Sequence, residues 1–142
     1  MPPEQVRVVL DTNVCLDAFV FDDPRAATLV TALVSGEVEA VTRADCRAEW
    51  LAVLSYPLLK LDEAKRAAAG ARFDALVTLL PTAEATTKPP RCRDGDDQKF
   101  LELAAASGAA VLFSRDAEVL RLGRRTLRGG LFAIMKPEDW VL

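Results

Sequence analysis

RVVLDTNVCLDAF, residues 7–19, is the stretch of sequence that decides the fold. The run at 6–10 is mostly apolar and β-branched, which is typical of a strand buried in a parallel sheet covered on both faces. Asp11 follows directly, and then Thr12 and Asn13. Such a carboxylate either caps the next helix or holds a ligand at the carboxyl end of the strand. These residue types are common helix caps, so the tripeptide alone favours the cap.

Strands and helices alternate along the rest of the chain. Gly36, Pro57 and Gly108 mark three of the helix ends. We expect a loop with a short strand over 81–97. The other predicted strands are 38–42, 109–114 and 131–135, and the predicted helices are 24–35, 45–54, 62–80, 98–107 and 115–123. Because parallel strands need crossover connections, this alternation predicts a parallel sheet with helices on both faces.

The length of 142 residues, 51% of them hydrophobic, suits one folded domain over residues 1–142. No apolar run approaches the roughly 20 residues that cross a bilayer. The N-terminal MPPEQVR lacks the basic start and apolar core of a signal peptide. We therefore expect a cytoplasmic protein that does not enter membranes.

The composition also narrows the chemistry. There is no histidine, which excludes Ser-His and Cys-His nucleophiles and zinc sites built on imidazole. Cys15, Cys46 and Cys92 are odd in number and lack CxxC spacing, so we expect reduced thiols without a disulfide framework. Catalysis would have to use carboxylates, hydroxyls, Lys, Arg or a metal ion.

Several acidic residues fall where ligands bind in parallel sheets, beyond the carboxyl ends of the strands. Asp11 follows the first strand, and Ser114 and Asp116 follow the strand at 109–114. If these strands are neighbours, Asp11 and Asp116 approach each other at the edge of the sheet. Asp97 at a helix start and Glu49 on a crossing helix can then point toward these two aspartates. Each residue also has an ordinary explanation as a helix cap or part of a polar face.

Clustered carboxylates repel one another unless some are protonated or a cation lies among them. Their oxygen atoms suit Mg²⁺ or Mn²⁺. Without histidine, a water activated by metal is the natural nucleophile, and the same ion can stabilise the charge on a phosphodiester.

Four segments resemble the PIN-domain family, and most closely its bacterial branch regarded as toxin components of toxin and antitoxin pairs. The segments are VVLDTNV, AEWLAVLSYP, CRDGDDQKFLELA and VLFSRDAEVL, in this order. The resemblance implies an α/β fold, a three-layer α/β/α sandwich with a mostly parallel central sheet. It also implies an endoribonuclease that depends on Mg²⁺ or Mn²⁺ and leaves a 5′ phosphate and a 3′ hydroxyl.

By position, the resemblance also assigns the site residues. The acidic quartet would be Asp11, Glu49, Asp97 and Asp116, of which the three aspartates would hold the metal ion. Asn13, Ser114 and Asp94 would support them, with Asp96 as an alternative to Asp94. The branch tends to have Pro where Gly95 stands, which makes this loop more flexible here.

RNA would also need basic contacts, although the net charge is −3. Arg91 and Arg93 flank the acidic loop, and Arg124 and Arg125 belong to a stripe that Gly123 interrupts. A solvated basic face is the other explanation for this stripe. The remaining expected partners are a cognate antitoxin protein and a second copy of the chain.

Two other functions stay open. The domain could be a binding or regulatory module that has lost activity. It could also be a phosphohydrolase with Asp11 as the nucleophile, although that chemistry commonly places a second acid two residues later, where this chain has Asn13.

Overall fold

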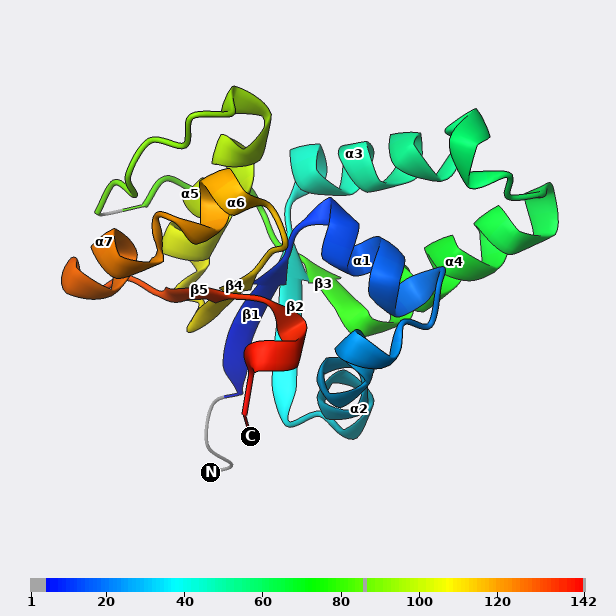
Figure 1. Ribbon diagram of the computed structural model, residues 1–142, viewed down its shortest axis with the longest axis horizontal. Helices are drawn as coiled ribbons and strands as arrows, with labels where there is room; N and C mark the ends of the chain where they lie inside the picture. The colour runs from blue at the N-terminus through cyan, green and yellow to red at the C-terminus, as the bar shows by residue number, and fades with distance from the viewer. Residues whose placement is uncertain (1–4, 86, 142) are drawn as a thin grey trace.

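The structure, a computed structural model, describes residues 5–85 and 87–141. Its strands form one sheet in the order β3-β2-β1-β4-β5, and every neighbouring pair is parallel (Figure 1). The strands are β1 (Val6–Leu10), β2 (Val38–Thr42), β3 (Val77–Leu79), β4 (Val111–Phe113) and β5 (Ala133–Met135). The predicted parallel sheet is confirmed.

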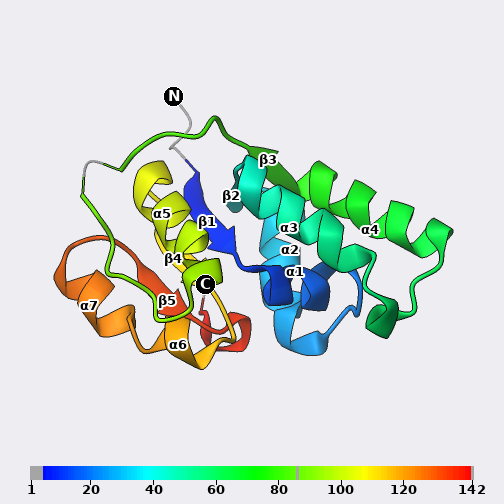
Figure 2. The same ribbon diagram turned by 90° about the horizontal axis from the view of Figure 1, so that it is seen from above.

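Helices cover both faces of the sheet, as Figure 2 shows from above. One face carries α1 (Thr12–Phe19), α2 (Ala27–Ser35), α3 (Ala44–Leu54) and α4 (Glu63–Leu76). The other face carries α5 (Gln98–Ser107), α6 (Ala117–Leu120) and α7 (Gly123–Arg128). Short 3₁₀ turns are η1 (Pro24–Ala26), η2 (Pro57–Leu59), η3 (Gly95–Asp97) and η4 (Pro137–Asp139).

Two cores follow from the alternation of side chains along each strand. Val8 and Leu10 pack in the core under α1–α4, whereas Val9 packs in the core under α5 and α6. Trp50 and Phe73 stack in the first core with ring centroids 5.3 Å apart. The expected three-layer α/β/α sandwich is therefore confirmed.

Several element predictions need correction. The short strand expected over 81–97 is absent from residues 81–85 and 87–97, which hold only the η3 turn. The helix predicted over 62–80 ends at Leu76, and β3 follows it, because the β-branched Val77 and Thr78 pair with β2. The helix predicted over 115–123 ends at Leu120, and a separate α7 begins at Gly123. Helix α1 was not among the predicted elements.

Two further expectations concern the cysteines and the membrane. All three cysteines are buried and free, as expected. Within the described residues, no helix combines the length and apolar character that crossing a membrane requires.

The central strands β1 and β4 position the candidate site. Leu10 and Phe113 are partners in the register, and the Asp11 amide donates to the Phe113 carbonyl at 3.0 Å. The residues after these two strands therefore leave the sheet at the same level. This confirms that the strand before Asp11 is a neighbour of the strand before Ser114.

Candidate active site

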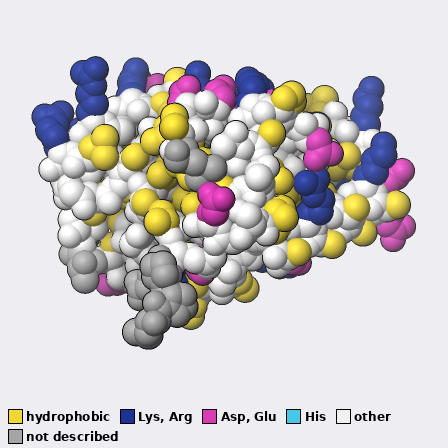
Figure 3. All heavy atoms as spheres, turned by 90° about the horizontal axis from the view of Figure 1, so that it is seen from below, with side chains coloured by type: hydrophobic (Ala, Val, Ile, Leu, Met, Phe, Trp, Pro, Cys, Tyr) yellow, Lys and Arg dark blue, Asp and Glu magenta, His cyan; other side chains and the backbone are white. Residues whose placement is uncertain are grey.

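A cavity of about 250 Å³ opens at the carboxyl ends of β1 and β4. It is lined by Asp11, Thr12, Asn13, Glu49, Val53, Asp94, Asp97, Phe100 and Asp116. Five of these nine residues are acidic. On the opposite end of the molecule, Figure 3 shows hydrophobic side chains across the middle and acidic ones scattered. The concentration of carboxylates is therefore a local feature of the strand ends.

Asp11 is both a helix cap and a buried carboxylate. Its backbone is extended at φ −70° and ψ 171°, and its Oδ1 accepts a hydrogen bond from the Val14 amide at 2.9 Å. Only 5% of the residue is exposed. Burial, and to a smaller extent the charge of Asp116, raise the pKa of Asp11 to about 6 against the lowering effect of hydrogen bonds from Ser114 and Val14. A role as a helix cap therefore explains the hydrogen bond to Val14, but not the burial of Asp11 or its raised pKa.

Ser114 connects Asp11 to Asp116. It is fully buried directly after β4, and its hydroxyl lowers the pKa of the Asp11 carboxyl. Its Oγ also accepts from the Asp116 amide at 3.1 Å. Asp116 caps α6, and its Oδ1 accepts from the Glu118 amide at 2.8 Å. Ser114 thus bonds to the backbone of one aspartate and influences the carboxyl group of the other.

Asp97 is the last residue of the η3 turn and precedes α5 directly, and its side chain makes no cap hydrogen bond. Burial raises the pKa of Asp97 to about 6. The negative charges that add to this rise are, in decreasing order, those of Asp116, Asp94, Asp11 and Glu49. The carboxylates thus influence Asp97 from four separate parts of the chain, which supports the expectation that they meet.

The loop before α5 offers three aspartates, and two of them face the cavity. Asp94 lines it and caps η3, with its Oδ1 accepting from the Asp96 amide at 2.9 Å. Asp96 is exposed and does not line the cavity. The geometry therefore favours Asp94 over Asp96.

Glu49 reaches the cavity from α3, and both of its carboxylate oxygens are engaged. Thr12 donates from its Oγ1 to Oε2, and Lys99 donates from its Nζ to Oε1 at 3.0 Å. Sequence reasoning missed both partners. Their positions, one residue after Asp11 and two after Asp97, were the available signal.

The donor set suits a hard divalent cation, because it consists of carboxylates without histidine or thiolate. A cation would also relieve the repulsion that contributes to the raised pKa of Asp97. As the side chains stand, however, no group of three or more His, Cys, Asp or Glu among residues 5–85 and 87–141 is arranged to hold a metal ion. Ion binding would require the carboxylates to converge further.

The predicted basic residues lie outside the cavity. Arg91 and Arg93 line a neighbouring hollow of about 440 Å³. Arg124 and Arg125 are exposed on α7. Figures 1 and 2 both show residues 88–94 running alongside α6 and α7. The two basic segments therefore occupy one side of the molecule, beside the acidic cavity.

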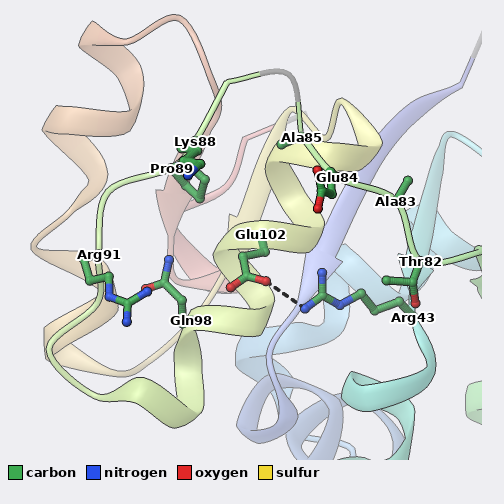
Figure 4. Close-up of a pocket in the computed structure, with 10 residues that line it drawn as sticks. All are labelled: Arg43, Thr82, Ala83, Glu84, Ala85, Lys88, Pro89, Arg91, Gln98 and Glu102. Atoms are coloured by element: carbon green, nitrogen blue, oxygen red, sulfur yellow. Dashed lines mark hydrogen bonds and ion pairs between the residues drawn. The ribbon is translucent and has the colours of Figure 1, made fainter.

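A larger hollow of about 570 Å³ lies under the loop that leads to α5. Figure 4 shows Arg91 and Gln98 pointing toward each other on one side of it, and Arg43 and Glu102 paired on the other. The pair joins Nη2 of Arg43 to Oε2 of Glu102 at 3.1 Å, and Asp45 engages the same guanidinium. Glu102 is already paired with Arg43, whereas the smaller cavity gathers five carboxylates, so we place the chemistry in the smaller cavity.

The family is shown by sequence. A model of the PIN domain matches residues 7–118, which is most of the chain. The chain belongs to the PIN domain family. The match contains the whole acidic cluster, from Asp11 to Asp116, and it ends before α7.

Solved structures support the fold of this PIN domain. One similar chain occurs in the crystal structure of VapBC2 from Rickettsia felis bound to a DNA fragment from their promoter. The TM-score is 0.60 at 14% sequence identity, and the match covers 92% of this chain and 98% of that one. At this identity the likeness concerns the fold alone. Among curated proteins, no sequence matches the chain.

Proposed function

We propose that the protein is an endoribonuclease that depends on Mg²⁺ or Mn²⁺ and hydrolyses phosphodiester bonds of single-stranded or structured RNA in the cytoplasm. The observation that carries the proposal is the convergence of carboxylates on one cavity, with the pKa values of Asp11 and Asp97 raised to about 6. Membership of the PIN domain family agrees with a nuclease role.

In this proposal Asp11, Asp97 and Asp116 hold the ion and Ser114 supports two of them. Glu49 faces the reacting phosphate from the opposite helix. When bound, the divalent ion would supply a nucleophilic water and neutralise charge on the phosphate. Asn13, exposed in the first turn of α1, supplies a neutral polar group at the rim of the cavity.

RNA would approach along the two basic segments. Most arginines of the described chain pair with a carboxylate, for example Arg47 with Asp74. Within the part of the chain that the structure describes, no ion pair engages the basic side chains of the two segments, namely Lys88, Arg91, Arg93, Arg124, Arg125 and Arg128. Unpaired arginines are suited to phosphate contacts, so they offset the negative cavity for an anionic substrate.

We further propose that the protein is the toxin of a toxin and antitoxin pair. The support is the resemblance of its motifs to that branch and the shared fold with a chain of VapBC2. A cognate antitoxin and a second copy of the chain are then the expected protein partners. Co-expression with the neighbouring reading frame, followed by purification through a tag on this chain, would test the first, and light scattering the second.

The activity itself is tested with labelled single-stranded RNA and purified protein. We expect cleavage with Mn²⁺ or Mg²⁺, none with EDTA, and none by the Asp116→Asn variant. Cleavage that persists in EDTA, or that Asp116→Asn retains, would contradict the proposal. A folded wild-type protein with no cleavage of any RNA or single-stranded DNA would favour an inactive binding module.

A further inference from the structure

Lys99 is the cation that contacts the acidic cavity most directly. Among the ion pairs that the described residues form, only the one between Lys99 and Glu49 includes a carboxylate of the cavity. The side chain of Lys99 is 19% exposed and that of Glu49 is 29% exposed. The pair is therefore more shielded than a surface salt bridge, whose partners are usually mobile.

Three groups hold the ammonium group of Lys99 in place. Its Nζ donates to Oε1 of Glu49 at 3.0 Å and also to the carbonyl oxygen of Asp96. It lies 5.2 Å from the centroid of the Phe100 ring, a distance typical of a cation–π contact. A lysine restrained on three sides loses much of the mobility of its stem, so it can orient a partner.

The partner that it orients is Glu49. With Thr12 on Oε2 and Lys99 on Oε1, the carboxylate is held between the start of α1 and the start of α5. Both contacts come from residues close in sequence to proposed metal ligands, since Thr12 follows Asp11 and Lys99 lies two residues after Asp97. The orientation of Glu49 is thereby tied to the elements that carry the aspartates.

We propose that Lys99 is a positioning residue that holds the Glu49 carboxylate in one orientation beside the three aspartates. This rests on the proposed nuclease function. Glu49 then acts from outside the set of metal ligands, and Lys99 acts through Glu49 rather than on the ion or the RNA. A lysine that only supported the ion would change the Mn²⁺-induced rise in melting temperature. A lysine that bound phosphate directly would mainly change KM.

The test is a double-mutant cycle on RNA cleavage at saturating Mn²⁺, with the full chain. Lys99→Met should lower kcat by about 10- to 100-fold, the range seen when outer-shell partners of a metal site are removed, with KM changed less than about threefold. Lys99→Arg, which keeps the charge and the donors, should recover most of kcat. In a Glu49→Gln background, Lys99→Met should cost little more, because the group through which it acts has already changed.

The control is Lys65→Met, at an exposed position on α4, which should leave kcat and KM unchanged. An equal loss of kcat from Lys99→Met in both backgrounds, or an effect confined to KM, would overturn the proposal. So would loss of the Mn²⁺-induced rise in melting temperature in Lys99→Met, because Lys99 would then support the ion itself.

Failure of the proposed function is recognised separately, since wild-type protein would then show no metal-dependent cleavage. In that case the pairing remains measurable in metal-free protein. The same four variants should show that the two substitutions are non-additive in melting temperature. Additive effects there would overturn the contact between Lys99 and Glu49.

Discussion

Asp11 and Asp62 do the same local task in very different surroundings. Both precede a helix with nearly equal backbone angles, φ −70° and ψ 171° for Asp11 and φ −77° and ψ 174° for Asp62. Each accepts a hydrogen bond from an amide three residues later, at 2.9 Å and 2.8 Å. Asp62 caps α4 at the exposed tip of the α3–α4 pair, whereas Asp11 is buried at the end of β1.

The difference lies in what surrounds each cap. Asp11 has Ser114 on its carboxylate and the charge of Asp116 nearby, and burial raises its pKa to about 6. Asp62 caps the helix on the surface, with solvent around it. A cap and a site residue therefore cannot be separated by local geometry, and the position in the sheet makes the distinction. Asp62 supplies a matched control for substitutions in the cavity.

The largest expected effect comes from Asp97, which has no capping bond to lose. Asp97→Asn should lower the rate of RNA cleavage at least about 100-fold, since a lost ligand removes about 3 kcal/mol or more of stabilisation from a metal-assisted transition state. Asp62→Asn should stay within about twofold of wild type. Rates measured with labelled RNA at fixed Mn²⁺ test this, and comparable rates for the two variants would remove Asp97 from the site.

Glu49→Gln should lower the cleavage rate by about 10-fold or more, because the carboxylate that Thr12 and Lys99 hold is replaced by a neutral amide. Unlike Asp97→Asn, it should retain the rise in melting temperature on adding Mn²⁺, since Glu49 is placed outside the ligand set. Melts with and without the ion separate these cases. Loss of that rise would make Glu49 a metal ligand.

Arg124 and Arg125 are exposed on α7, outside the acidic cavity, so they should affect RNA binding more than catalysis. Changing both to Ala should weaken RNA binding and reduce the slope of log affinity against log salt by up to about 1.4, at about 0.7 per phosphate contact with a single strand. The same change at Lys65 and Arg66, on the far helix α4, is the control. An unchanged slope would assign α7 to solvent or to an antitoxin.

In the metal-free protein, Asp11 and Asp97 should contribute less stability as pH rises from about 4 to about 6. Asp11 and Asp97 have pKa values raised to about 6, so in this interval the folded state binds more protons than the unfolded state. The favourable contribution is complete below the unfolded pKa and lost as pH passes through 6. Across this range the melting temperature of Asp11→Asn should therefore fall less steeply, or rise more, than that of the wild type.

Much of this arrangement could be predicted from the sequence. The apolar run before Asp11 and the alternation of elements predict the parallel sheet, and the aspartates after strands predict the edge at which they meet. The helix at 98–107 and the strand at 38–42 were predicted with the observed bounds. The helix carries an apolar periodicity and the stop signal Gly108, and the strand is a short segment with β-branched residues that begins soon after Gly36.

Other features depend on contacts between distant residues. The sequence predicts a helix across β3, because Val77 continues the helical spacing and only pairing with β2 makes this segment a strand. The roles of Thr12 and Lys99 depend on where Glu49 comes to lie, 37 and 50 residues away along the chain. No local pattern encodes such contacts, so they were missed.

The most direct test of the central claim compares Asp11→Asn with Asp62→Asn in thermal melts with and without Mn²⁺. Asn caps a helix about as well as Asp, so both variants should remain folded. The account predicts that Mn²⁺ raises the melting temperature of wild type and Asp62→Asn but not of Asp11→Asn, because the ion stabilises only a native state that binds it. An undiminished rise in Asp11→Asn, together with full RNA cleavage, would show that Asp11 is only a helix cap and would contradict the metal site.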